Sequence, residues 1–90
     1  MDELTAVRLK INQVDNELAK LFEKRMELVE EVVKYKKAHH MDIFDNKREQ
    51  EVIINNSKLV NEAVREYYVK VLQCMMDVSK EYQKEIMEEE

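Results

Sequence analysis

The sequence predicts an all-α protein with three helices per chain, one long, one short and one of medium length, that assembles as a homodimer. Its 90 residues contain no glycine and no proline, the residues that normally form turns and interrupt helices. Long stretches place apolar residues alternately three and four positions apart, the spacing of one helix face. A single domain over residues 1–90 also buries too little apolar surface to be very stable alone, which favours oligomerisation.

The first helix is predicted from about Glu3 to about Lys37, because its apolar residues form a heptad seam. The seam comprises Leu4, Val7, Ile11, Val14, Leu18, Leu21, Leu28, Val32 and Tyr35. A helix of about 35 residues is ~52 Å long, whereas a compact domain of about 100 residues has a radius of gyration of only ~13 Å. Two shorter helices cannot cover the whole seam, so we expect a second copy of the long helix to pack along it about a two-fold axis.

The remaining elements follow in order along the chain. Residues 39–44 break the apolar pattern and are predicted to form a loop. Asp45 or Asn46 can cap a second helix, which ends near residues 55–57. A third helix is predicted from about Val60 to about Glu85. Its apolar face comprises Val64, Tyr68, Val71, Met75 and Tyr82.

The composition argues against several classes of function. A net charge of -5 argues against nucleic acid as a general partner, and the lack of glycine excludes glycine-rich phosphate loops. No apolar run approaches the roughly 20 residues that span a bilayer, and the N-terminus lacks a signal peptide's apolar core. The single cysteine, Cys74, is expected to be a buried, reduced thiol. These features predict a cytoplasmic protein.

Arg25 interrupts the seam of the first helix, because the spacing places the next apolar position there. Lys36 lies about three turns later and returns to nearly the same face, ~16 Å away along the axis. Together these two cations could grip a small anion. Alternatively, Arg25 pairs with an acidic residue on another helix and Lys36 is a solvated helix end. A buried cation needs an anion in either case.

Polar residues interrupt the other two helices in the same way. Ser79 and Gln83 continue a stripe that starts with apolar residues, and both can donate hydrogen bonds. The alternative is that this stripe reaches solvent near the end of the helix. Arg48 and Glu49 precede Val52 by four and three positions and can point toward the same interior, although capping and surface charge would also explain them.

Arg8 lies ~25 Å from Arg25 along the first helix, so one small ligand cannot touch both side chains of one chain. In an antiparallel dimer, however, Arg8 of one subunit can approach the far half of the other subunit's long helix. The interrupting residues include no nucleophile–base pair and no metal cluster, and the adjacent His39 and His40 point in different directions, so we expect no metal. A cation-rich pocket of this kind suits a compact dianion, or a reaction that needs only positioning and charge stabilisation.

At these positions the sequence resembles the all-helical class of chorismate mutases over nearly its full length. The matching elements are residues 8–15 with Leu18, then Arg25, Lys36, residues 45–49, and Ser79 with Gln83. The resemblance implies an intertwined dimer of three-helix chains with two active sites, each borrowing an arginine from the opposite subunit. It implies the rearrangement of chorismate to prephenate, on the route to phenylalanine and tyrosine. This pericyclic step needs no cofactor and forms no covalent enzyme intermediate.

The resemblance also implies a role for each site residue. Arg25 and Arg8 of the partner subunit hold the two carboxylates of the substrate through bidentate pairing. Lys36 and Gln83 donate to the ether oxygen, where negative charge grows as the C–O bond breaks, and Glu49 accepts from the ring hydroxyl. The other substrate-binding residues are Asp45, Arg48 and Ser79 in the polar lining and Val32, Val52 and Met76 as apolar walls.

Two alternatives stay open on the sequence alone. Isochorismate-pyruvate lyases share the fold and much of the cationic site, and they act on a similar dianion. In a non-catalytic helical dimerisation module, Arg25 and Lys36 would instead form ion pairs with protein carboxylates. No dehydrogenase, dehydratase or synthase domain accompanies the helices, so we expect a stand-alone mutase or a domain of a longer chain.

Overall fold

The computed structural model describes residues 2–89, which form three helices and no strand. The helices are α1 (Glu3–Ala38), α2 (Asn46–Ser57) and α3 (Glu62–Glu88). The predicted all-α fold class is therefore confirmed. The bounds of α1 and α2 agree closely with the prediction, whereas α3 begins at Glu62 rather than Val60 and ends at Glu88 rather than Glu85.

Hydrogen bonds at both ends define α1. The Asp2 carboxylate accepts a hydrogen bond from a backbone N–H of the first turn at 2.7 Å, which caps the helix and lowers the pKa of Asp2. At the other end, the N–H of Met41 donates to the Lys36 carbonyl at 2.8 Å, and the N–H of His40 donates to the Lys37 carbonyl at 3.4 Å. This is a Schellman motif, in which His40 adopts a φ of 54° where glycine is usual.

The turn between α2 and α3 is closed by an arginine. Asn61 caps α3 by accepting a hydrogen bond from the Ala63 N–H at 3.0 Å, which explains the later start of this helix. The half-buried Arg65 donates from Nε to the Ser57 carbonyl at 2.7 Å and from Nη2 to the Val60 carbonyl at 3.1 Å. The Ser57 carbonyl at the end of α2 lacks an intrahelical partner and the Val60 carbonyl lies in the turn, so Arg65 satisfies both and ties α2 to α3.

Replacing Arg65 with alanine is expected to lower the free energy of unfolding by about 1–3 kcal/mol, because part-buried carbonyls lose a charged donor. Urea unfolding followed by circular dichroism, at one fixed protein concentration, measures this change. Lys84→Ala is the matched control, since Lys84 is exposed on α3 and makes no side-chain hydrogen bond within residues 2–89. Equal stability of the two variants would show that Arg65 does not hold the turn.

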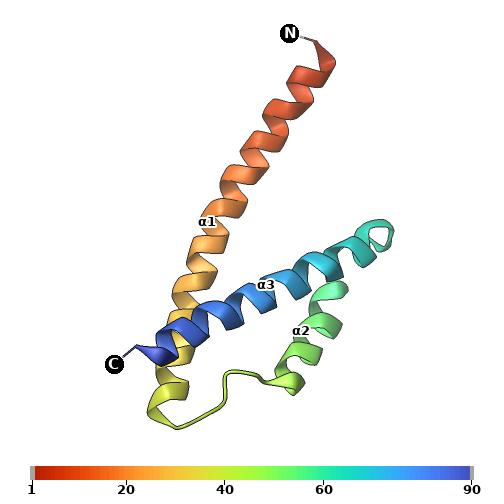
Figure 1. Cartoon of the computed structure of the whole chain (residues 1–90). Coiled ribbons are helices and arrows are strands. Elements are labelled where there is room, and N and C mark those ends of the chain that lie inside the picture. Colours follow the sequence, from red (N-terminus) through yellow and green to blue (C-terminus); the bar gives the residue numbers. More distant parts are fainter. Residues whose placement is uncertain (1, 90) are drawn as a thin grey trace.

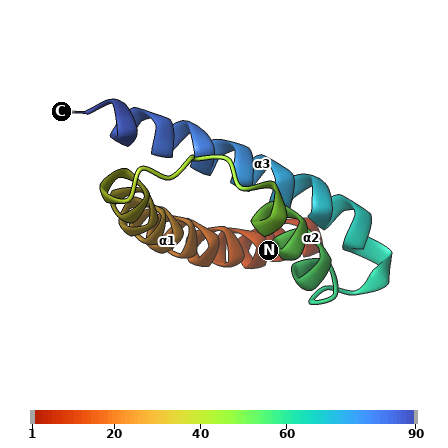
Figure 2. The same cartoon turned by 90° about the horizontal axis from the view of Figure 1, so that it is seen from below.

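The helices form an elongated chain rather than a closed bundle. α3 packs across the C-terminal half of α1, and α2 lies against α3 (Figure 1). The N-terminal half of α1 projects away from both (Figure 1), and the chain extends over 55 × 28 × 14 Å. Residues 39–45 bridge the end of α1 to the start of α2 (Figure 2). None of these three helices has an apolar stretch long enough to cross a membrane.

The heptad seam of α1 is not the face that α1 buries against its own chain. All nine seam residues are 46–62 % exposed. In the described part of α1 only Val33, one position off the seam, is buried, and with Leu72 and Met76 it makes up the small apolar core. A helix presents separate faces to separate neighbours, and α3 covers the face of Val33. The seam is left uncovered along its whole length.

Two expectations about α3 are wrong for the single chain. Cys74 is exposed rather than buried. Val64 and Val71, from the predicted apolar face, are 50 % and 56 % exposed. The buried stripe of α3 instead comprises Leu72, Met76, Ser79 and Gln83. Cys74 lies about 200° around the helix from Leu72, at about 100° per residue, and so faces away from the core.

Candidate active site

A cavity of about 290 Å³ lies between the three helices. Its lining comprises Arg25, Leu28, Val29, Val32 and Lys36 of α1, Ile43 and Asp45 of the connecting segment, Arg48, Glu49 and Val52 of α2, and Met76, Ser79, Lys80 and Gln83 of α3. Apolar walls with a few convergent polar groups are typical of small-molecule sites. The buried stripe of α3 therefore serves both the core and the cavity.

The structure brings every predicted site residue to this cavity except Arg8. Arg8 is exposed on the N-terminal half of α1, which projects away from the other helices (Figure 1). This agrees with the expectation that Arg8 cannot reach the ligand of its own chain. Four further lining residues were not predicted as site residues, namely Leu28, Val29, Ile43 and Lys80.

Arg25 is held by a hydroxyl rather than by a carboxylate. Its Nη1 donates to Ser79 Oγ at 2.5 Å, and Ser79 Oγ donates in turn to the Met75 carbonyl at 2.8 Å. Ser79 is only 5 % exposed, so both of these bonds lie away from bulk water. The hydroxyl has one proton, and the Met75 carbonyl takes it. In this arrangement Ser79 orients Arg25 and has no proton left for a ligand carboxylate.

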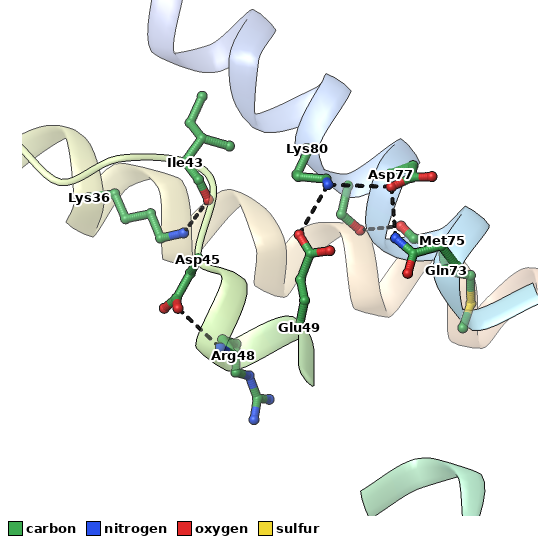
Figure 3. Close-up of polar contacts among 10 residues, drawn as sticks. Lys36, Ile43, Asp45, Arg48, Glu49, Gln73, Met75, Asp77 and Lys80 are labelled. Carbon is green, nitrogen blue, oxygen red and sulfur yellow. Dashed lines mark hydrogen bonds and ion pairs between the residues drawn. The ribbon is translucent and has the colours of Figure 1, made fainter. Parts of the chain in front are cut away.

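Lys36 is likewise bound to a neutral group. Its Nζ donates to the Ile43 carbonyl at 2.8 Å, which anchors the connecting segment over the cavity (Figure 3). An ammonium group carries three protons, so this bond leaves two for a ligand. The carbonyl belongs to the backbone, and for this reason the identity of residue 43 gave no indication of the contact.

The three cavity cations Arg25, Lys36 and Arg48 have no carboxylate partner in the described chain. The ion pairs within residues 2–89 are Lys34–Glu30, Lys80–Glu49 and Lys80–Asp77. A dimerisation module is expected to pair Arg25 and Lys36 with protein carboxylates, and no carboxylate among residues 2–89 of the same chain pairs with them. Arg25 and Lys36 are part-buried, whereas Arg48 is exposed. Part-buried positive charge that no acid among residues 2–89 neutralises favours an anionic ligand.

Gln83 lies deep in the cavity wall and is 7 % exposed. Its Oε1 is buried and accepts no hydrogen bond within the described residues. An unpaired buried acceptor costs about 1–3 kcal/mol, so the side chain favours a ligand that completes its hydrogen bonding. Rotation of the amide by a half-turn exchanges oxygen and nitrogen, which lets Gln83 present a donor to an acceptor atom instead.

Glu49 forms a salt bridge with Lys80, a contact that the sequence did not indicate. Its Oε2 lies 3.1 Å from Lys80 Nζ, which also contacts Asp77 Oδ1 at 3.3 Å (Figure 3). The hydrogen bond to Glu49 raises the pKa of Lys80 above its usual value. Lys80 comes directly after Ser79 of the buried stripe. From the sequence alone, a lysine at this position would be expected to be solvated.

A cavity between helices, lined by apolar walls, cations and hydrogen-bonding side chains, defines the class as an all-helical protein with a small-molecule site. Residues 7–84 match the family described as chorismate mutase type II, and the chain belongs to that family. Over 91 aligned positions it is 29 % identical to a chorismate mutase of Methanocaldococcus jannaschii, an alignment that covers 99 % of this chain and 92 % of that protein. No solved structure matches the chain significantly.

Proposed function

We propose that this protein is a chorismate mutase that rearranges chorismate to prephenate, on the route to phenylalanine and tyrosine. The family match and the related archaeal mutase support the activity. The observation that carries the assignment to this cavity is that its two part-buried cations, Arg25 and Lys36, have no carboxylate partner within residues 2–89. A doubly negative substrate supplies the missing charge.

The proposed mechanism uses position and charge alone. Arg25, oriented by Ser79, pairs with one substrate carboxylate. Lys36 donates a hydrogen bond to the ether oxygen from an N–H group that Ile43 does not occupy, and Gln83 donates a second one from α3 after its amide has turned. Negative charge grows on that oxygen as the C–O bond breaks, so both donors bind the transition state more strongly than the substrate. The apolar walls, Val32, Val52 and Met76, press the reacting atoms together.

We further propose that the active enzyme is an intertwined homodimer in which Arg8 of the partner subunit completes each site. The uncovered seam supports this, because nine aligned apolar residues are left for a second chain. Leu28 and Val32 belong both to the seam and to the cavity lining. A second α1 along the seam would therefore border the cavity and could bring its Arg8 to the ligand. A cytoplasmic location stays a prediction.

Chorismate supplied to the purified protein should lose its absorbance and yield prephenate. Isochorismate supplied separately is the control, since a lyase would convert it to salicylate and pyruvate. Prephenate from chorismate without pyruvate from isochorismate supports the mutase. Pyruvate release alone would replace the proposed function with the lyase, and no reaction with either dianion would leave a non-catalytic module.

A further inference from the structure

We propose that Lys80 is a positioning residue of this site, which holds the Glu49 carboxylate in the orientation that accepts the ring hydroxyl of the substrate. The inference rests on the proposed function and adds to the site a residue that the sequence did not predict as a site residue. Lys80 does not touch the reacting atoms in this scheme. It acts through Glu49.

The two carboxylate oxygens of Glu49 have different partners: one is paired with Lys80, and the other is available to a ligand. Oε2 is bound by Lys80 Nζ at 3.1 Å (Figure 3). Within residues 2–89, Oε1 makes no hydrogen bond. The Glu49 side chain is only 15 % exposed, so little water competes for the salt bridge. With one oxygen fixed, rotation of the carboxylate is restricted, and the other oxygen of this cavity-lining residue has no partner and is available to a ligand.

Lys80 can hold Glu49 because Lys80 is itself held from two other sides. Asp77, one turn earlier on α3, lies 3.3 Å from its ammonium group. The ring of Phe44, in the segment before α2, lies 4.9 Å from Nζ in a cation–π contact. Contacts from α2, from α3 and from the connecting segment therefore fix the cation in one place. Its side chain is 29 % exposed, compared with 55 % for Asp77.

Charge gives a second reason for a cation at this position. A lone Glu49 carboxylate would repel a dianionic ligand across a small, part-buried cavity. The lining contains four cations and two carboxylates, an excess of two positive charges within one chain, to which the Arg8 proposed from the partner subunit would add a third. Lys80 neutralises Glu49 and thereby preserves this excess. The structure thus allows an ionised acceptor inside a site built for an anion.

A double-mutant cycle on the purified protein tests the inference. Wild type, Lys80→Met, Glu49→Gln and the double variant are compared by kcat and KM for chorismate. Lys80→Met should lower kcat/KM about 10- to 100-fold, whereas the same change in the Glu49→Gln background should cost less than about twofold, because the amide has no charge to hold. Lys80→Arg should recover most of the activity. Lys84→Met, one turn further along the exposed face, should not alter it.

Three outcomes would overturn the inference while the mutase itself stands. These are wild-type activity in Lys80→Met, the same fold loss in both backgrounds, or full activity in Glu49→Gln. A purely structural salt bridge would show this coupling in the melting temperature and not in kcat/KM. If Lys80→Met does not form the dimer, Lys80→Gln replaces it in the cycle, because its neutral amide keeps a polar contact with α2. A wild-type protein that does not convert chorismate would defeat the proposed function instead.

Discussion

Replacing Lys36 with alanine is expected to lower kcat for chorismate roughly 100- to 1,000-fold, because the variant lacks a pre-positioned donor at the oxygen where charge develops. Lys36 is half-buried in the cavity wall, and its neutral partner, the Ile43 carbonyl, leaves its charge free for a ligand. Binding of the ground-state dianion should suffer less than turnover, since the ether oxygen gains most of its charge in the transition state. Steady-state kinetics separates the two effects.

Lys34→Ala is the matched control for this variant. Lys34 lies on the same helix but pairs with Glu30 at 3.4 Å with 68 % of its side chain exposed. An exposed pair of this kind contributes at most about 1 kcal/mol to the free energy of unfolding. Lys34 does not line the cavity, so kcat and KM should be unchanged. Circular dichroism and size-exclusion chromatography should show both variants folded and of wild-type size. Near-normal turnover of Lys36→Ala would remove the proposed role of this lysine.

Co-expressed Arg8→Ala and Arg25→Ala chains are expected to recover activity that neither chain has alone. Each mixed dimer contains one site with the intact Arg25 of one subunit and the intact Arg8 of the other. Half of randomly paired dimers are mixed, so about one quarter of the wild-type sites should be active. Differently tagged chains allow the mixed dimer to be isolated and assayed directly.

The same experiment with Arg25→Ala and Arg48→Ala provides the control. Both of these arginines line the cavity of their own chain, so every site in a mixed dimer lacks one of them. No recovery is expected in that pair. If the Arg8 and Arg25 mixture is equally inactive, the two residues do not act in one shared site, and Arg8 must act elsewhere.

The helical elements and most of the cavity could be predicted from the sequence because periodicity is local information. The interruption of the seam at Arg25 and the return of Lys36 to the same face depend only on helical repeat. The same holds for Ser79 and Gln83, which share the buried stripe with Leu72 and Met76. The roles of these residues came from the family resemblance and remain to be tested.

Only the tertiary structure decided which partner each of these groups has. It showed that Val33 rather than the seam faces α3, because two faces of one helix cannot be assigned to neighbours from spacing alone. It showed that the Ser79 hydroxyl donates to the Met75 carbonyl and that Lys36 donates to the Ile43 carbonyl. Every residue has a backbone carbonyl, so such partners cannot be recognised from the residue type. It also brought Lys80 to Glu49 across two helices, a contact set by how the helices pack rather than by either local sequence.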